Sequence, residues 1–262
     1  MAARGALPPP LPGRKPPFVQ TLKALRSSPL AVIAEYKRAS PSEGDINLSS
    51  TPEEAAAAYA RAGAAALSVL TESEYFKGDI SHLARMTGPG LPLLRKDFIF
   101  HPLQAAQSAA TPASAVLLIA RMLTDDVLRD LLRLCMRLDL TPVVEVFDAS
   151  DLRRAKAAGA SVIQVNNRDL QALRVDTTIS RRLIAAREDE EFWITASGMR
   201  SRGDLLAAAE AGFDAALIGT ALMRGGNPEA ALSALLQSET DAGAAKGTGS
   251  PSGTKAGDAG HA

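Results

Sequence analysis

The chain has 262 residues, and its 29 Lys and Arg residues balance 29 Asp and Glu residues, so the formal net charge is zero. This balance gives no electrostatic reason to expect nucleic acid or a membrane surface as a partner, and an anion-binding site must be local. A single cysteine excludes an internal disulfide and a cysteine-cluster metal site. Cys135 lies in an amphipathic helical pattern, where we expect it to be buried in the core.

The two ends of the chain differ from its middle. Residues 1–17 are rich in proline and lack the apolar stretch of a secretory signal, so we expect them to be extended or disordered. Residues 238–262 are mostly Gly, Ala, Ser and Thr, which bury too little apolar surface to become ordered. No apolar run approaches the ~20 residues that span a bilayer. We therefore predict one folded domain at 18–237 in a cytoplasmic protein.

The first segment of that domain, Phe18–Arg26, has helical spacing and is expected to cover the bottom or the rim of the fold. Eight short apolar or β-rich runs follow it, separated by stretches long enough for a helix. The runs are Ala31–Ala34, Ala65–Leu70, Leu91–Leu94, Ala115–Ile119, Pro142–Val146, Val162–Val165, Phe192–Thr195 and Ala215–Ile218.

Helical patterns lie between these runs. Pro52–Ala62 is preceded by Thr51, a good capping residue, and Pro52 suits the first helical position. The other helix candidates are Asp125–Leu138, Ala149–Ala158, Thr177–Arg187 and Ser201–Ala211. Strands that alternate with helices predict a parallel sheet. Eight such units favour a closed (β/α)8 TIM barrel over an open doubly wound sheet, since no G-x-G-x-x-G motif follows the first strand.

Charged residues stand at the ends of several predicted strands. Glu35 and Lys37 follow the first strand, Lys96 follows the third, and Glu145 lies inside the fifth. Taken alone, Glu145 or Lys96 is explained as well by an internal ion pair as by a catalytic role. Because the strands of a parallel barrel all end at the same face, we expect these groups to form one acid–base site there. Asp97 should be structural, since it points away from Lys96 in an extended chain.

Small residues end the last two predicted strands. Ser197-Gly198 follows the seventh strand and Gly219-Thr220 follows the eighth. Glycine lets backbone N–H groups approach an anion, and a short helix at Thr220–Arg224 would point its N-terminus toward it. We expect a phosphate site here, although glycine is also common in ordinary turns. None of the three histidines has a partner at metal-ligand spacing, so we expect no metal.

Seven segments resemble the indole-3-glycerol phosphate synthase family, in order, through residues 18–237. They are IAEYKRASPSEGDI (33–46), LSVLTESEYFKGDISHL (67–83), LLRKDFIFHPLQ (93–104), VEVFD (144–148), VNNRDL (165–170), SGM (197–199) and LIGTALMR (217–224). The resemblance implies a carboxy-lyase of tryptophan biosynthesis. Such an enzyme converts 1-(2-carboxyphenylamino)-1-deoxy-D-ribulose 5-phosphate to indole-3-glycerol phosphate by ring closure, decarboxylation and dehydration, and it needs no cofactor. The resemblance also implies possible association with other enzymes of that pathway.

The resemblance further implies a role for each candidate residue. Lys96 would protonate the ketone oxygen, and it can do so if burial and nearby Lys37 lower its pKa. Glu145 would manage the later proton transfer and dehydration, while Glu35 and Lys37 order the site and hold the anionic substrate. The remaining implied positions are Asn166, Arg168 and Ser40 for the substrate's anionic groups, Phe76 for the anthranilate ring, and Ser197, Gly198, Gly219 and Thr220 for the phosphate.

The sequence departs from the family pattern in two places. Ala196 stands where the family usually has a glutamate, one of three carboxylates around the reacting atoms, and the N-terminal extension is shorter than usual. Two other hypotheses therefore remain. One is the related isomerase that makes this substrate, against which the Glu35 and Lys37 motif argues. The other is a degenerate barrel that binds a phosphorylated ligand without turnover, for which Ala196 is the support.

Overall fold

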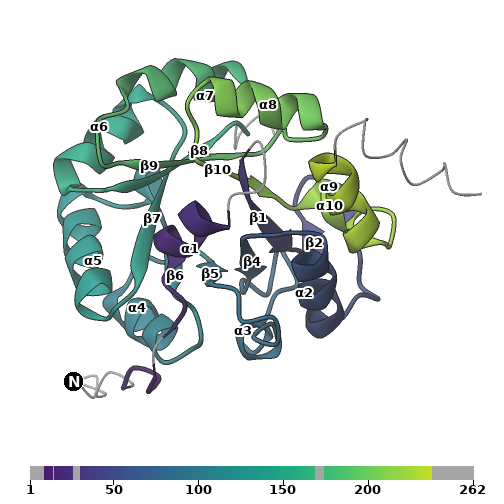
Figure 1. The fold of residues 1–262 in the computed structure, drawn as a ribbon. Coiled ribbons are helices and arrows are strands. Elements are labelled where there is room, and N and C mark those ends of the chain that lie inside the picture. Colours follow the sequence, from purple (N-terminus) through teal and green to yellow (C-terminus); the bar gives the residue numbers. More distant parts are fainter. Residues whose placement is uncertain (1–8, 14, 26–29, 169–173, 238–262) are drawn as a thin grey trace, which may run out of the picture.

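The computed structural model of the protein describes residues 9–13, 15–25, 30–168 and 174–237. These residues form a closed barrel of eight parallel strands, in which successive strands pair and the last one returns to the first (Figure 1). The strands are β1 (Ala31–Tyr36), β4 (Ala66–Leu70), β5 (Leu93–Lys96), β6 (Ala115–Ile119), β7 (Thr141–Val146), β8 (Val162–Asn166), β9 (Phe192–Ala196) and β10 (Ala215–Ile218). The predicted (β/α)8 fold and all eight predicted strands are confirmed.

Helices cover the outside of the barrel (Figure 1). They are α2 (Pro52–Arg61), α3 (His82–Arg85), α4 (Pro102–Ala109), α5 (Asp125–Arg137), α6 (Ala149–Ala158), α7 (Thr178–Leu183), α8 (Arg202–Glu210), α9 (Thr220–Met223) and α10 (Pro228–Leu236). All five predicted helices are present, but the one predicted at 177–187 is α7 followed by a 3₁₀ turn at Ile184–Ala186. A hairpin of two short strands, β2 (Ala39–Ser40) and β3 (Gly44–Asp45), follows β1.

Local sequence signals fix the ends of several helices. Thr51 accepts a hydrogen bond from the backbone N–H of Glu54, and the Glu54 side chain accepts one from the N–H of Thr51, which forms a capping box at the start of α2. At the other end of a helix, Gly159 ends α6 with a left-handed φ of 92°, a conformation that glycine adopts without strain. Such signals determine the residues at which these helices begin and end.

The strands are buried on both faces, and alternate residues divide between two apolar clusters. In β9, Trp193 packs in the outer cluster between the sheet and the helices, whereas Phe192 and Ile194 belong to the cluster inside the barrel. Because side chains alternate along a strand, residues two apart share a face. The same rule places Glu35 on the interior face together with Ile33. Cys135 is fully buried in the outer cluster, as expected, and burial raises the pKa of its thiol to about 12.

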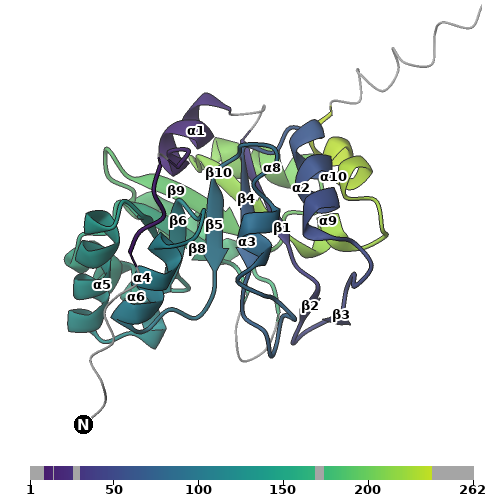
Figure 2. The ribbon, with the colours of Figure 1, turned by 90° about the horizontal axis from the view of Figure 1, so that it is seen from below.

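Helix α1 (Phe18–Ala24) closes the N-terminal end of the barrel. Its Phe18 and Leu22 are almost fully buried in the interior cluster, among residues from the starts of the strands. Figure 2 shows α1 at the end of the barrel opposite to the β2–β3 hairpin. Of the two places expected for this helix, the bottom and the rim, the structure therefore has the bottom.

The described part of the proline-rich leader runs along the barrel without forming a helix or strand. The backbone N–H of Leu11 and the Lys15 ammonium both donate to the carbonyl of Ala109 at the end of α4, at 2.8 and 2.9 Å. Residues 1–8 and the tail predicted to be disordered at 238–262 lie outside the described residues. Within the described ranges, no helix combines the length and apolar character needed to cross a membrane.

Replacing Leu22 with alanine should lower the free energy of unfolding by about 3 kcal/mol, because it empties a fully buried site at the bottom of the barrel. Chemical denaturation measures the change. Leu25→Ala is the matched control, since Leu25 follows the same helix but is 48% exposed, and it should change stability by less than about 1 kcal/mol. Equal losses in the two variants would contradict the packing of α1 into the barrel.

Candidate active site

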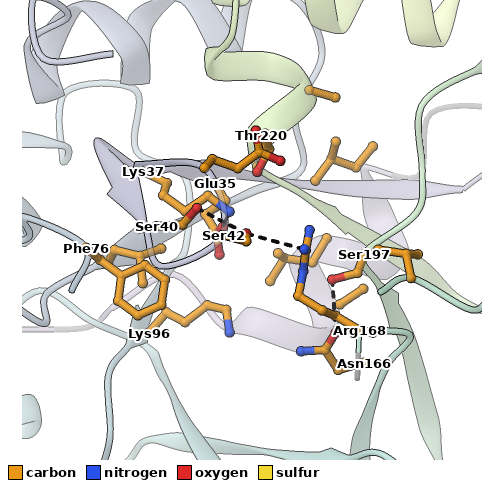
Figure 3. Close-up of a pocket in the computed structure, with 18 of the residues that line it drawn as sticks. Glu35, Lys37, Ser40, Ser42, Phe76, Lys96, Asn166, Arg168, Ser197 and Thr220 are labelled. Carbon is orange, nitrogen blue, oxygen red and sulfur yellow. Dashed lines mark hydrogen bonds and ion pairs between the residues drawn. The ribbon is translucent and has the colours of Figure 1, made fainter. Parts of the chain in front are cut away.

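A cavity of about 470 Å³ opens at the C-terminal ends of the strands. Every predicted site residue lines it, and ten of the lining residues are labelled in Figure 3. The predicted residues brought together here are Glu35, Lys37, Ser40, Phe76, Lys96, Glu145, Asn166, Arg168, Ser197, Gly198, Gly219 and Thr220. They come from strands β1, β4, β5, β7, β8, β9 and β10 and from the loops that follow them, so the convergence of parallel strands accounts for their meeting.

Glu35 forms the first ion pair of the site. It is 3% exposed, and its Oε1 lies 3.3 Å from Nζ of Lys37, two residues further along the same strand exit. Ser68 on the neighbouring β4 donates a hydrogen bond to the other carboxylate oxygen at 3.3 Å. A buried carboxylate needs such partners to stay charged. Glycine is required opposite it, because a Cβ atom at Gly219 would overlap the Glu35 carboxylate.

Lys96 and Glu145 form the second ion pair, with Nζ and Oε2 3.5 Å apart. Burial by itself lowers the pKa of Lys96, but the carboxylates of Glu145 and Glu35 outweigh it, so the pKa lies above the usual value. The expectation that burial and Lys37 would lower this pKa is therefore wrong, because the nearest charges are negative. Lys96 is a fully protonated donor at neutral pH, and the long contact to Glu145 leaves N–H bonds free for a ligand.

Asn166 and Arg168 extend the site beyond the end of β8. Oδ1 of Asn166 accepts hydrogen bonds from the Ser197 hydroxyl at 2.9 Å and from the backbone N–H of Arg168 at 3.0 Å. The Arg168 guanidinium donates to Ser42 at 3.3 Å, which ties this strand end to the β2–β3 hairpin (Figure 3). Arg224 after α9 also forms an ion pair with Glu43 of the hairpin. Two arginines thus hold the hairpin beside the cavity mouth.

The turn after β9 has a conformation that few residues adopt. Ser197 has φ of 66° and Gly198 has φ of 93°, so two successive residues are left-handed. A Cβ atom at Gly198 would lie only 2.8 Å from the Thr177 side chain. After the neighbouring strand β10, Thr220 begins the short helix α9, whose first backbone N–H groups have no partner within the helix. Both strand ends therefore bring polar backbone close to the cavity.

Aromatic side chains line the opposite wall. Phe76, in the loop after β4, packs against Phe98, in the loop after β5, with ring centroids 6.3 Å apart and planes tilted by 53°. Both rings line the cavity, and Figure 3 shows Phe76 beside the Lys96 side chain. Gly78 lets the Phe76 loop turn back, because a Cβ atom there would overlap the carbonyl of Leu70. This wall suits a flat, apolar part of a ligand.

Asp97 has a structural role, as its position after Lys96 predicted. Oδ2 of Asp97 accepts from Arg95 at 2.8 Å and from the Thr71 hydroxyl at 2.6 Å. Arg95 is buried outside the barrel, where it also donates to Gln107 and Ser108 of α4. The Arg95–Asp97 pair therefore fastens α4 to the end of β5.

Ala196 puts a methyl group in the cavity wall at the end of β9. It is 3% exposed and pairs in register with Asn166 on one side and Leu217 on the other. The two ion pairs inside the barrel contain the carboxylates of Glu35 and Glu145. Among the residues that the structure describes, no group of three or more His, Cys, Asp or Glu side chains is arranged to hold a metal ion.

Several polar residues of the site were not predicted. Ser42, Glu43, Glu72, Arg200 and Arg224 line the cavity, and Ser68 and Gln164 donate hydrogen bonds to its buried carboxylates. Gln164 lies in the run that the sequence analysis treated as apolar, yet its Nε2 donates to Oε2 of Glu145. The alternation along β8 carries the missing signal, because Gln164 stands two residues before Asn166 and so shares its face. Ser68 stands opposite Glu35 in the register of β1 and β4. The sequence does not contain this register, so Ser68 could be identified only from the structure.

Comparison with known proteins agrees with this geometry. The profile of the family described as indole-3-glycerol phosphate synthase matches residues 11–235. The chain belongs to this family. Indole-3-glycerol phosphate synthase of Aquifex aeolicus is 44% identical over 222 residues, covering 84% of this chain and 86% of that protein. The enzyme of the same name from Mycolicibacterium smegmatis is 42% identical over 226 residues, with coverage of 86% and 83%.

Solved structures confirm the fold alone. The crystal structure of 3-hexulose-6-phosphate synthase from Salmonella typhimurium is similar with a TM-score of 0.61 over 79% of this chain and 96% of that chain, at 14% identity. The N-acetylmannosamine-6-phosphate 2-epimerase of Clostridium perfringens has a TM-score of 0.59 over 81% and 95%, at 16% identity.

Replacing Arg95 with methionine should lower the free energy of unfolding by about 3 kcal/mol, since it leaves Asp97 without its buried cation. Thermal and chemical unfolding measure this loss. Arg129→Met is the control, because Arg129 pairs with Asp126 on the exposed surface of α5, and it should cost less than about 1 kcal/mol. If Arg95→Met were as stable as the control, Asp97 would not need its partner.

Proposed function

We propose that the protein converts 1-(2-carboxyphenylamino)-1-deoxy-D-ribulose 5-phosphate to indole-3-glycerol phosphate, CO2 and water, as a carboxy-lyase of tryptophan biosynthesis. The single observation that carries the proposal is the buried Lys96–Glu145 pair, which stands at the mouth of a barrel of this family. It supplies a proton donor and a carboxylate at one point of the cavity. Ring closure followed by dehydration needs both groups.

In the first step, the ring carbon that bears the carboxylate attacks the ketone carbon of the substrate. A carbon–carbon bond forms, and the electrons of the C=O π bond move to the oxygen. We assign Lys96 as the acid that gives this oxygen its proton, because a ring carbon is a weak nucleophile and the carbonyl must be polarised. The contact between Lys96 and Glu145, at 3.5 Å, is loose enough for the ammonium to turn toward the ketone.

The next steps restore the aromatic ring. The bond to the carboxylate breaks, its electrons return to the ring, and CO2 leaves. The new hydroxyl group takes up one proton and departs as water, while the methylene carbon beside the nitrogen loses one proton to form the second ring's double bond, so the dehydration consumes no net proton. We assign Glu145 to that proton, since its buried carboxylate lies beside Lys96, on which the first proton was carried. None of these steps changes a redox state.

The rest of the cavity fits the substrate's other groups. Lys37 and Arg168 are cations suited to the carboxylate, and the ring wall of Phe76 and Phe98 suits the anthranilate ring. We assign the phosphate to the turn at Ser197 and Gly198 and to the adjacent segment Gly219–Thr220, whose small residues let backbone N–H groups approach it. Asn166 holds Ser197 in place, and Ser40 also lines the cavity. Action in the cytoplasm and association with other enzymes of the pathway stay predictions.

Incubating the purified protein with the carboxyphenylamino substrate and following indole fluorescence tests the proposal directly. The alternative function, binding of a phosphorylated ligand without turnover, is favoured by the methyl group of Ala196 in the cavity wall. Ligand binding with no indole formation would support that alternative. Formation of indole-3-glycerol phosphate with release of CO2 would exclude it.

Lys96→Met should lower kcat by about 10²–10⁴-fold, the usual contribution of a general acid, while binding of the phosphorylated product stays measurable. Steady-state kinetics and calorimetry give the two quantities. Lys23→Met is the control because Lys23 is exposed on α1, and it should leave kcat unchanged. A Lys96→Met variant that kept more than about a tenth of the wild-type rate, roughly 1.4 kcal/mol of barrier, would refute the assignment.

The pH profile of kcat should show no alkaline limb from Lys96 between about pH 7 and about pH 9.5. The pKa of Lys96 is raised above its reference value of 10.5, so its proton is retained as the pH rises through this range. Stopped assays across the range, with circular dichroism to verify folding at each pH, provide the measurement. A limb with a midpoint near pH 8 that Lys96→Arg abolished would show that the pKa is lowered instead.

A further inference from the structure

Gln164 is a fully buried polar side chain inside the barrel that the mechanism above does not use. It is the third residue of β8 and is 0% exposed. The register of β7 and β8 places it directly beside Glu145. Its Nε2 donates a hydrogen bond to Oε2 of Glu145.

The same carboxylate oxygen is the one that faces Lys96, whose Nζ lies 3.5 Å away. Oε2 of Glu145 is therefore held between an ammonium group on β5 and an amide N–H on β8. On its other neighbour, β6, Ile119 stands opposite Glu145 and offers no polar group. The charged groups that face Glu145 are Lys96 and, across the cavity, the Glu35–Lys37 pair of β1. Gln164 adds a donor that carries no charge.

The hydrogen bond from Gln164 to Glu145 leaves the amide oxygen of Gln164 in an unfavourable environment. Oε1 of Gln164 is buried and has no hydrogen-bond partner among the residues that the structure describes. A buried acceptor without a partner is unfavourable. Turning the amide over would place Oε1 against the Glu145 carboxylate, where two acceptors would meet. An apolar side chain of the same length would fill the space without either problem, so packing alone does not explain a glutamine here.

We propose that Gln164 is a positioning residue that holds Glu145 ionised and turned toward Lys96. The N–H···O bond stabilises the charged form of the carboxylate and fixes the oxygen that faces the ammonium. In catalysis, Glu145 then remains available as a base while Lys96 gives up its proton. The catalytic consequence rests on the proposed function, whereas the effect on the charge of Glu145 does not.

The decisive variant is Gln164→Met, which keeps the length of the side chain and removes both the donor and the unpaired acceptor. We expect kcat at neutral pH to fall about tenfold and the acid limb of its pH profile to move upward by about one unit. KM should change less than kcat. Thermal stability should be equal to or above that of the wild type, since the unpaired oxygen is gone. A residue that only filled space would give unchanged kinetics.

Two further variants complete the set. Gln164→Glu keeps the shape but places a second carboxylate beside Glu145, and it should move the acid limb further upward because two adjacent carboxylates resist double ionisation. Gln20→Met is the matched control on the exposed surface of α1, and it should change neither the rate nor the profile. Gln164→Glu also keeps the test open if the methionine variant folds poorly.

A measurement without turnover separates this proposal from the proposed function. ¹³C NMR of glutamate-labelled protein follows the carboxyl signals with pH, and the signal of Glu145 is assigned by its loss in Glu145→Gln. In Gln164→Met, protonation of Glu145 should occur at higher pH than in the wild type. An unchanged titration would overturn the role of Gln164 even in an active enzyme. An inactive wild type whose Glu145 titration moves in the variant would overturn the proposed function and keep Gln164 as the partner of Glu145.

Discussion

The structure of the site depends on keeping charge inside an apolar barrel. Glu35 and Glu145 are each 3% exposed, and an isolated carboxylate at such depth would give up its charge. Each one has a lysine within reach, Lys37 at 3.3 Å and Lys96 at 3.5 Å. The other requirements of the site follow from these two pairs. Strands must end where the lysines reach the carboxylates, and a glycine must stand where a side chain would displace one of them.

Most of the fold follows from local signals in the sequence. The eight apolar runs are strands because they are short and β-rich and are separated by helical patterns, several of which end at a glycine. Gly63, Gly159 and Gly212 all have the left-handed φ expected after a helix. The candidate residues meet around one cavity because their strands are parallel and close into a barrel, and this holds whichever roles they have. The topology of the barrel was therefore enough to predict that charged residues far apart in the sequence form a single site.

Other features depend on distances that the sequence does not contain. The direction of the Lys96 pKa shift depends on which charges lie nearest, and these are Glu145 and Glu35, which are far from it in the chain. The sequence analysis did not identify Gln164 as a site residue, because a single polar residue in a β-rich run has no evident role until its neighbour in the sheet, Glu145, is known. Helical spacing at Phe18–Ala24 predicted a helix, but it did not say which end of the barrel that helix covers.

The packing of α1 determines how substrate and products reach and leave the cavity. Phe18 and Leu22 fill its N-terminal end, and the cavity opens at the other end, beside the β2–β3 hairpin. In the described part of the chain, substrate therefore enters and products leave through the same opening, at the C-terminal end of the barrel. A product that dissociates slowly blocks binding of the next substrate. The contacts of Arg168 and Arg224 with the hairpin at this opening therefore affect the rate of product release as well as the affinity for substrate.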